Sequence, residues 1–188
     1  MFRSLFRKKK KASGEEPADD SIRSARVGDI VFIPGFWETG DDAYLIVDEI
    51  NRLESAYGES REVIGVDGER HASLEWTDDG GLHISATTQE RPLGLSSVGL
   101  DYDTLVEWDD HKSLENSIEY EGLRYFYRNS YEVLHFKGDS IDGEGFWIWE
   151  FIRDDEEGAV TVVKREGLPF EVYASVSVSP HLITVYKK

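Results

Sequence analysis

The sequence predicts an all-β (mainly β) protein made of two tandem, structurally similar small units, β-barrels or β-sandwiches, that pack together. Three observations favour this fold. Short apolar and aromatic runs alternate with Gly, Asp and Asn from residue 25 onward, which is typical of consecutive strands. Long segments with helical periodicity are hard to find. Similar segments also recur in the same order in the two halves of the 188-residue chain, which is the pattern of an internal repeat.

The expected strands follow one another at short intervals. Residues 54–70 form either a hairpin or a loop with one strand. In the sequence LEW, Leu74 and Trp76 face one side and Glu75 the other, since side chains alternate along a strand. Residues 146–152 are apolar on both faces, so we expect this strand to be covered on both sides, at the seam between the units. The expected strands cover residues 28–35, 43–50, 71–76, 81–87, 122–128, 130–136, 145–152, 159–165, 170–176 and 182–188.

The repeat keeps a nearly constant register. Glu75 in the first half corresponds to Glu150 in the second, and residues 97–108 align without gaps on residues 175–186. The alternative is chance agreement between two β-rich segments. A true repeat would make the halves two copies of one structural unit.

These matches divide the chain into three parts. We expect a disordered basic leader and polar linker over residues 1–24, a first β unit over residues 25–112 and a second β unit over residues 113–188. A unit of about 80 residues buries a modest core and is only marginally stable alone. The two units are therefore expected to pack against each other.

The leader combines apolar and basic side chains. If residues 2–7 become helical, Phe2, Leu5 and Phe6 share one face. Each cation near an anionic leaflet contributes on the order of 1 kcal/mol, so we expect residues 1–11 to bind anionic lipid reversibly. The alternative is a frayed terminus that only keeps the chain end soluble, and binding of RNA or an acidic protein is a more distant one. The basic residues of the leader are Arg3, Arg7, Lys8, Lys9, Lys10 and Lys11.

The rest of the chain is strongly acidic. Because residues 1–12 contribute +6 and residues 13–20 contribute −4 to the net charge of −17, residues 21–188 contribute −19. This charge repels phosphate backbones and argues against a nucleic-acid partner. The absence of cysteine excludes disulfides, thiol catalysis and Cys-ligated metals. No stretch approaches the roughly 20 apolar residues of a membrane span. We therefore expect a cytoplasmic protein, peripheral at the inner membrane.

The sequence contains no recognisable motif for catalysis or cofactor binding. Phosphate-binding loops and nucleophile elbows are missing, and the five histidines form no pair with metal-ligand spacing. We therefore expect no enzyme activity, no cofactor and no metal site. Glu75 and Glu150 recur beside aromatic residues, as a glycosidase pair would, but internal symmetry also produces such a match. If Glu150 is buried, we expect it to bind a turn or an arginine such as Arg153 or Arg165.

Aromatic residues are abundant, with five Trp, nine Tyr and nine Phe. Core packing accounts for most of them, and a groove that binds a sugar or a peptide is the alternative. Phe36 and Trp37 follow a Pro-Gly turn, which places them near the surface. These two residues are our candidate contact with a partner.

Several segments carry a family resemblance. The basic start MFRSLFRKKKK, the strand VGDIVFI, the aromatic strand GFWIWEF and the segment VTVVKREGLPFEVYASVSVSP followed by LITVY resemble the bacterial family catalogued as domain of unknown function 4178. The likeness covers most of residues 24–188. The family carries no catalytic residues to transfer. The resemblance implies a context near membrane-stress proteins similar to phage shock protein A, small multispan membrane proteins and polyamine-type enzymes.

The leading functional hypothesis is a non-enzymatic adaptor that binds a protein partner and is tethered reversibly to the inner membrane by residues 1–11. The resemblance implies a partner similar to phage shock protein A. The alternative is a soluble module that binds a ligand, such as a cationic small molecule, a carbohydrate or a peptide. A cationic ligand such as a polyamine suits the acidic charge. An unrecognised hydrolase is the third hypothesis. The sequence indicates no particular oligomeric state.

Overall fold

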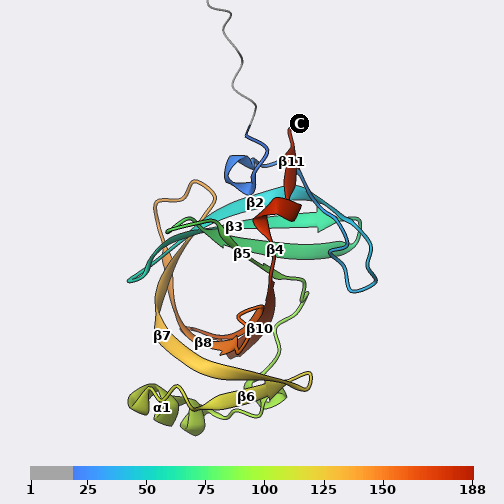
Figure 1. The fold of residues 1–188 in the computed structure, drawn as a ribbon. Coiled ribbons are helices and arrows are strands. Elements are labelled where there is room, and N and C mark those ends of the chain that lie inside the picture. The colour runs from blue at the N-terminus through green and yellow to red at the C-terminus, as the bar shows by residue number, and fades with distance from the viewer. Residues whose placement is uncertain (1–18) are drawn as a thin grey trace, which may run out of the picture.

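The structure is a computed structural model that describes residues 19–188. Within these residues, eleven strands form one antiparallel sheet (Figure 1). The prediction of a mainly β protein is confirmed. The strands are β1 (Ile30–Ile33), β2 (Ala43–Ser55), β3 (Gly58–Asp67), β4 (Arg70–Thr77), β5 (His83–Thr87), β6 (Ser117–Tyr120), β7 (Leu123–Lys137), β8 (Glu144–Arg153), β9 (Gly158–Arg165), β10 (Phe170–Ser177) and β11 (Thr184–Tyr186). The helices are α1 (Tyr102–His111) and the short 3₁₀ segments η1 (Ile22–Ser24), η2 (Leu95–Val98) and η3 (Pro180–Leu182).

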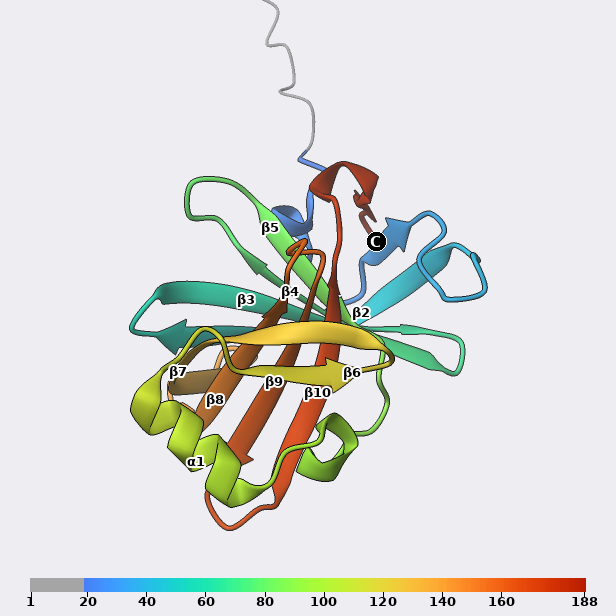
Figure 2. The same ribbon diagram turned by 60° about the horizontal axis from the view of Figure 1, so that its bottom comes forward.

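Eight of these strands close into a ring. They follow the order β2-β3-β4-β5-β10-β9-β8-β7, and β2 pairs again with β7. Leu53 lies opposite His135 at the β2–β7 junction, and Ala86 lies opposite Val176 at the β5–β10 junction. The ring is visible end-on in Figure 1 and from another side in Figure 2. We call it the closed sheet.

The two predicted units contribute equally to the closed sheet. Residues 25–112 supply β2 to β5 and residues 113–188 supply β7 to β10, each as four consecutive antiparallel strands. The four-strand order is thus repeated, and whether each half is a unit in its own right stays a prediction. The gapless match between residues 97–108 and 175–186 is not a structural equivalence, because the first segment contains α1 and the second contains η3 and β11.

The two longest strands share one irregularity. β2 has a bulge between Val47 and Glu49, and β7 has a bulge between Tyr127 and Asn129. A bulge inserts one extra residue and changes which side chains face each side of the sheet. Val47 therefore packs outside the closed sheet whereas Leu53, six positions later, faces its interior.

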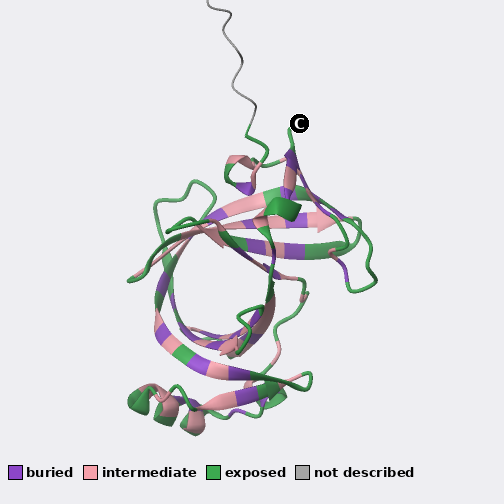
Figure 3. Cartoon of the chain, in the orientation of Figure 1, coloured by how far each residue is buried: buried purple, intermediate pink, exposed green. Residues whose placement is uncertain are grey.

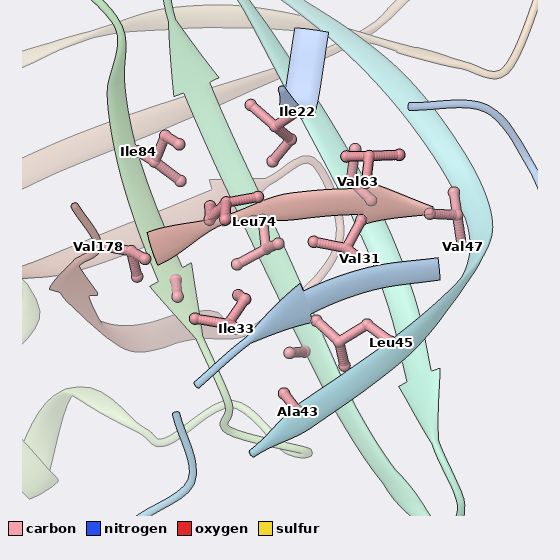
Figure 4. Packing of buried hydrophobic residues seen from close by; sticks show 14 of the residues in the cluster. Ile22, Val31, Ile33, Ala43, Leu45, Val47, Val63, Leu74, Ile84 and Val178 are labelled. Atoms are coloured by element: carbon pink, nitrogen blue, oxygen red, sulfur yellow. The ribbon is translucent and has the colours of Figure 1, made fainter. Parts of the chain in front are cut away.

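One hydrophobic core lies outside the closed sheet, over β2 to β5. The segments η1, β1 and β11 cover this face (Figure 4). Leu45 and Leu74 are fully buried there, and Gly65 is required because a Cβ at this position would lie 2.8 Å from Leu45 Cβ. We call this cluster the first outer core. Its buried residues are Ile22, Val31, Ile33, Trp37, Ala43, Leu45, Val47, Val63, Ala72, Leu74, Ile84, Ala86, Val178, Ile183 and Val185.

A second outer core covers the other half of the closed sheet. Here α1, β6 and η2 pack against the outer face of β7 to β10, as the lower part of Figure 2 shows. The helix begins at Asp101, whose side chain accepts a hydrogen bond of 2.8 Å from the backbone N–H of Thr104. The buried residues of the second outer core are Val98, Leu100, Leu105, Ile118, Tyr125, Tyr127, Trp149, Phe151, Val160, Val162 and Val172.

Several local predictions can now be compared with the structure. Residues 54–70 form the hairpin between β2 and β3 and the whole of β3, as one of the two alternatives predicted. The strands expected over residues 122–128 and 130–136 are one strand, β7. The structure also contains α1, which the sequence analysis took for part of the β repeat. Ile22 is buried in the first outer core, so the ordered body begins before residue 25.

Residues 146–152 are covered on both sides, as predicted, and their outer face packs against residues of the first half. These residues lie in β8, between β7 and β9, and the junctions between the two halves are β2–β7 and β5–β10. Its neighbours in the ring belong to the second half, but α1 and η2 of residues 25–112 cover its outer face, where the ring of Trp108 lies 6.1 Å from that of Phe151. Trp149 and Phe151 pack in the second outer core, whereas Phe146 and Ile148 face the interior of the closed sheet.

None of the helices in residues 19–188 has both the length and the apolar character needed to cross a bilayer. The basic leader, residues 1–11, lies outside the described part of the chain, so its predicted lipid contacts have no structural counterpart to report.

Candidate functional site

The interior of the closed sheet encloses a cavity of about 1180 Å³. This volume reaches beyond the range of roughly 300–1,000 Å³ that is usual for small-molecule sites. Eight acidic side chains and only two arginines, Arg91 and Arg165, line it. The cavity therefore carries a strong negative charge. The acidic lining residues are Glu54, Glu59, Glu62, Glu69, Glu75, Asp79, Glu90 and Glu150.

Strand alternation explains why the interior is polar. In β4, Ala72 and Leu74 face the first outer core, whereas Ser73, Glu75 and Thr77 line the cavity. Side chains of consecutive residues point to opposite sides of a strand, so an apolar outside gives a polar inside. The colour alternation along the strands in Figure 3 follows this pattern. The orientation of Leu74 and Glu75 agrees with the prediction.

Glu62 on β3 is held by several donors. Asn51 Nδ2 donates to Glu62 Oε2 at 2.9 Å, and Ser73 Oγ donates to Glu62 Oε1 at 2.7 Å. His135 Nε2 lies 3.5 Å from Oε2, an ion-pair distance without hydrogen-bond geometry. Burial alone would raise the pKa of Glu62, but these partners outweigh it and lower the pKa below its ordinary value. Glu62 is a satisfied carboxylate.

Glu75 on β4 has far less compensation. Within residues 19–188, the side-chain hydrogen bond that it accepts is from Ser60 Oγ, at 2.6 Å. The Glu75 side chain has solvent-accessible surface, but that surface faces the cavity and not the outside of the protein. Protein atoms therefore surround the carboxylate. Burial raises the pKa of Glu75, and the neighbouring carboxylates of Glu62 and Glu150 raise it further.

Glu150 on β8 is the third carboxylate inside the closed sheet. Tyr131 Oη donates a hydrogen bond of 2.8 Å to its Oε1, so the arginine partners predicted from the sequence are wrong. Arg153 binds Asp155, and Arg165 pairs with Glu171. Burial raises the pKa of Glu150 more than the hydrogen bond from Tyr131 and the charge of Arg128 together lower it. Burial also raises the pKa of Tyr131, so this hydroxyl remains a donor.

Glu75 and Glu150 come from opposite walls of the cavity. β4 and β8 are separated by four steps in either direction around the eight-strand ring. Both side chains line the cavity, and the charge of Glu150 acts on the pKa of Glu75. The two acids that recur in the sequence thus share one interior space. The arrangement can hold a positive group or a proton between them.

The wall formed by β7, β8 and β9 carries an apolar patch beside Glu150. Val133, Phe146, Ile148 and Val163 form a buried cluster that faces the cavity. Leu53, Tyr131 and Tyr173 pack against this cluster and also line the cavity. The site therefore combines a carboxylate pair with a hydrophobic surface, the mixture that is usual in pockets for organic ligands.

Phe36 and Trp37, the candidate partner contact, take part in packing. Trp37 is only 8% exposed and belongs to the first outer core, against which Phe36 packs. Its Nε1 donates to Asp67 Oδ2 at 2.9 Å, and the guanidinium of Arg70 lies 4.5 Å from the centre of its ring. A structural role accounts for Trp37, and its contact with a partner stays a prediction.

Metal ligation has no evident location in the described part of the chain. Among residues 19–188, no group of three or more His, Asp or Glu side chains is arranged to hold an ion. Within residues 19–188, the carboxylate that pairs with His135 Nε2 is that of Glu62.

Sequence reasoning missed Glu62, Tyr131 and the cavity itself. The sequence does contain a signal for the polar interior. Ser60 and Glu62 on β3, and Ser73 and Glu75 on β4, are two positions apart and so share one face of their strand. These positions are polar on the face opposite to the apolar residues.

Comparisons of the chain with models of protein families, with curated proteins and with solved structures find no match. The resemblance to the family of domain of unknown function 4178 therefore stays a prediction.

Proposed function

We propose that this protein binds a small organic cation in the cavity of the closed sheet. The observation that carries the proposal is the pair of undercompensated carboxylates, Glu75 and Glu150, on opposite walls of a cavity large enough for a ligand. This corresponds to the ligand-binding alternative of the sequence analysis, with a cation as the preferred ligand class.

The physical basis is the cost of leaving charged groups without partners. Burial without sufficient hydrogen-bond or charged partners destabilises the ionised form of a carboxyl group. An ammonium group supplies several N–H donors and a positive charge, and charge-assisted hydrogen bonds are about twice as strong as neutral ones. Binding of a cation would relieve the repulsion between Glu75 and Glu150. The acidic lining would also raise the local concentration of cations before they bind.

The proposal is tested by thermal denaturation of the full chain with a panel of primary amines that includes putrescine, spermidine and octylamine. We expect at least one amine to raise the melting temperature in a concentration-dependent way, since a ligand that binds only the folded state stabilises it. The double variant Glu75→Gln/Glu150→Gln should lose this response. Glu115→Gln/Glu119→Gln, which also removes two negative charges but at exposed positions, is the matched control and should keep it. A panel without any stabilising amine contradicts the proposal.

The proposed activity is binding without chemistry. The carboxylate pair is also the group that the sequence analysis considered for glycoside hydrolysis. Release of reducing sugar from glycosides by the protein, lost in both Glu75→Gln and Glu150→Gln, would replace the binding proposal with a hydrolase.

The adaptor hypothesis concerns a different part of the chain. The charge pattern of residues 1–11 supports reversible contact with anionic lipid, and such a tether is compatible with ligand binding by the body. Flotation with anionic vesicles compares the full chain with a version that starts at Ser21. Equal recovery of both proteins in the floating fraction would contradict the proposed contact of residues 1–11 with lipid.

A further inference from the structure

We infer that the ligand is an amphipathic primary amine, with one cationic head and an apolar tail or ring, and that it is not a polycation. This inference rests on the proposed function and names its ligand class. It follows from the distribution of polar and apolar groups around the cavity, where the two walls differ in chemistry.

The head position is set by which carboxylates remain available. Glu62 is occupied by Asn51 and Ser73, so it has little need of a further donor. Glu75 and Glu150 each accept one side-chain hydrogen bond from within residues 19–188. An ammonium group between them would bind two carboxylates that each have a single side-chain donor.

Of the two arginines that line the cavity, Arg91 and Arg165, neither donates a side-chain hydrogen bond to Glu75 or Glu150. Arg165 pairs with Glu171 and its guanidinium lies 4.6 Å from the centre of the Phe146 ring. Arg165 lies opposite Phe146, whereas Glu150 lies opposite Thr161, four positions further along β8. Neither Glu75 nor Glu150 forms an ion pair within residues 19–188, so a ligand can supply the direct cationic partner that both lack.

The tail position is set by a continuous apolar patch next to Glu150. Ile148 lies two positions before Glu150, on the same face of β8, and Val163 lies directly opposite Ile148 on β9. Phe146 continues the patch along β8 and pairs with Val133 on β7. The strand from Glu150 to Phe146 spans about 13 Å at about 3.3 Å per residue, which is long enough for an extended octyl chain.

A second ammonium group on the tail would lie against this patch. The apolar side chains offer it no acceptor, and burial of an unpaired charge is strongly unfavourable. A tail of methylene groups instead gains about 0.8 kcal/mol for each group that is buried. The patch thus selects against a diamine of the same length.

The test compares three probes of equal chain length by isothermal titration calorimetry on the full chain. Octylamine carries a head and a tail, diaminooctane carries two heads, and octanol carries no charge. We expect octylamine to bind at least tenfold more tightly than either of the others.

Variants of the apolar wall refine the test. Val163→Thr keeps the size of the side chain but adds a hydroxyl, so it should weaken octylamine several-fold and leave diaminooctane unchanged or tighter. Thr87→Val, the reverse change on the polar wall of the same cavity, is the matched control and should not weaken octylamine. Far-ultraviolet circular dichroism shows whether each variant is folded.

The outcomes separate the two proposals. If diaminooctane binds as tightly as octylamine, the amphipathic ligand is overturned and the cation-binding function stands. If octanol binds as tightly as octylamine, charge is irrelevant and the proposed function itself is overturned. If none of the three probes binds, both proposals are overturned.

Discussion

The two faces of the closed sheet have opposite chemistry. The outer face carries the two hydrophobic cores, each covered by short segments at the chain ends or by α1 and β6. Within residues 19–188, the inner face carries eight acidic side chains, among them Glu62, Glu75 and Glu150, and one smaller apolar cluster. The fold therefore derives most of its hydrophobic stabilisation from outside the ring, which leaves the interior free for a ligand.

This comparison predicts that the same substitution at two positions of β8 lowers the free energy of unfolding by unequal amounts. Phe151 on β8 is fully buried in the second outer core, whereas Phe146 on the same strand lines the cavity. We expect Phe151→Ala to lower the free energy of unfolding by about 3–5 kcal/mol, because it leaves a new void in a packed core. Phe146→Ala should cost less than half as much, since its ring already borders open space.

Chemical denaturation of both variants measures these free energies. An equal cost for Phe146→Ala and Phe151→Ala would mean that the interior is packed as tightly as the outer core, and would contradict the comparison.

The next two predictions compare Glu62 and Glu75, two carboxylates inside the ring that should affect stability in opposite directions. Glu62→Gln should lower the free energy of unfolding by about 1–3 kcal/mol at neutral pH, because hydrogen bonds to a charged acceptor are lost. The pKa of Glu62 is lowered in the folded state, so its contribution is present above the ordinary value of 4.5 and is lost as the pH falls through the folded-state pKa. Denaturation curves at several pH values measure the difference from the wild type. A difference that persists at low pH would contradict the role given to the charge.

The smallest effect has the opposite sign. Glu75→Gln should raise the free energy of unfolding at neutral pH, because the pKa of Glu75 is raised and the folded state resists its ionisation. A raised pKa means that stability is lost as the pH rises from the ordinary value of 4.5 through the folded-state pKa. The difference in free energy of unfolding between Glu75→Gln and the wild type should grow over that pH interval and then level off. A variant less stable than the wild type at every pH would show that Glu75 has partners comparable to those of Glu62.

Much of the fold could be predicted from the sequence, because alternating apolar residues and turn signals mark strands directly. The helix α1 was missed although its signals are present. Asp101 caps it, and Leu105 and Trp108 lie three positions apart on its buried side. The match to residues 175–186 favoured a strand, and ten residues of helix give a weak periodic pattern.

The site was only partly predictable. Recurrence singled out Glu75 and Glu150, which do share the cavity. Alternation shows which residues share a face, but the closure of β2 onto β7 decides whether that face looks outward or inward. That closure depends on pairing between distant strands, and local sequence carries little information about it.

The central claim is that a cation binds between Glu75 and Glu150, and a crystal structure of the full chain with octylamine tests it most directly. The account predicts the amine nitrogen within about 3 Å of both carboxylates, a charge-assisted hydrogen-bond distance, and the alkyl chain along Ile148 and Val163. An amine bound only on the outer acidic surface, or an interior filled by side chains with no room for a ligand, would contradict it.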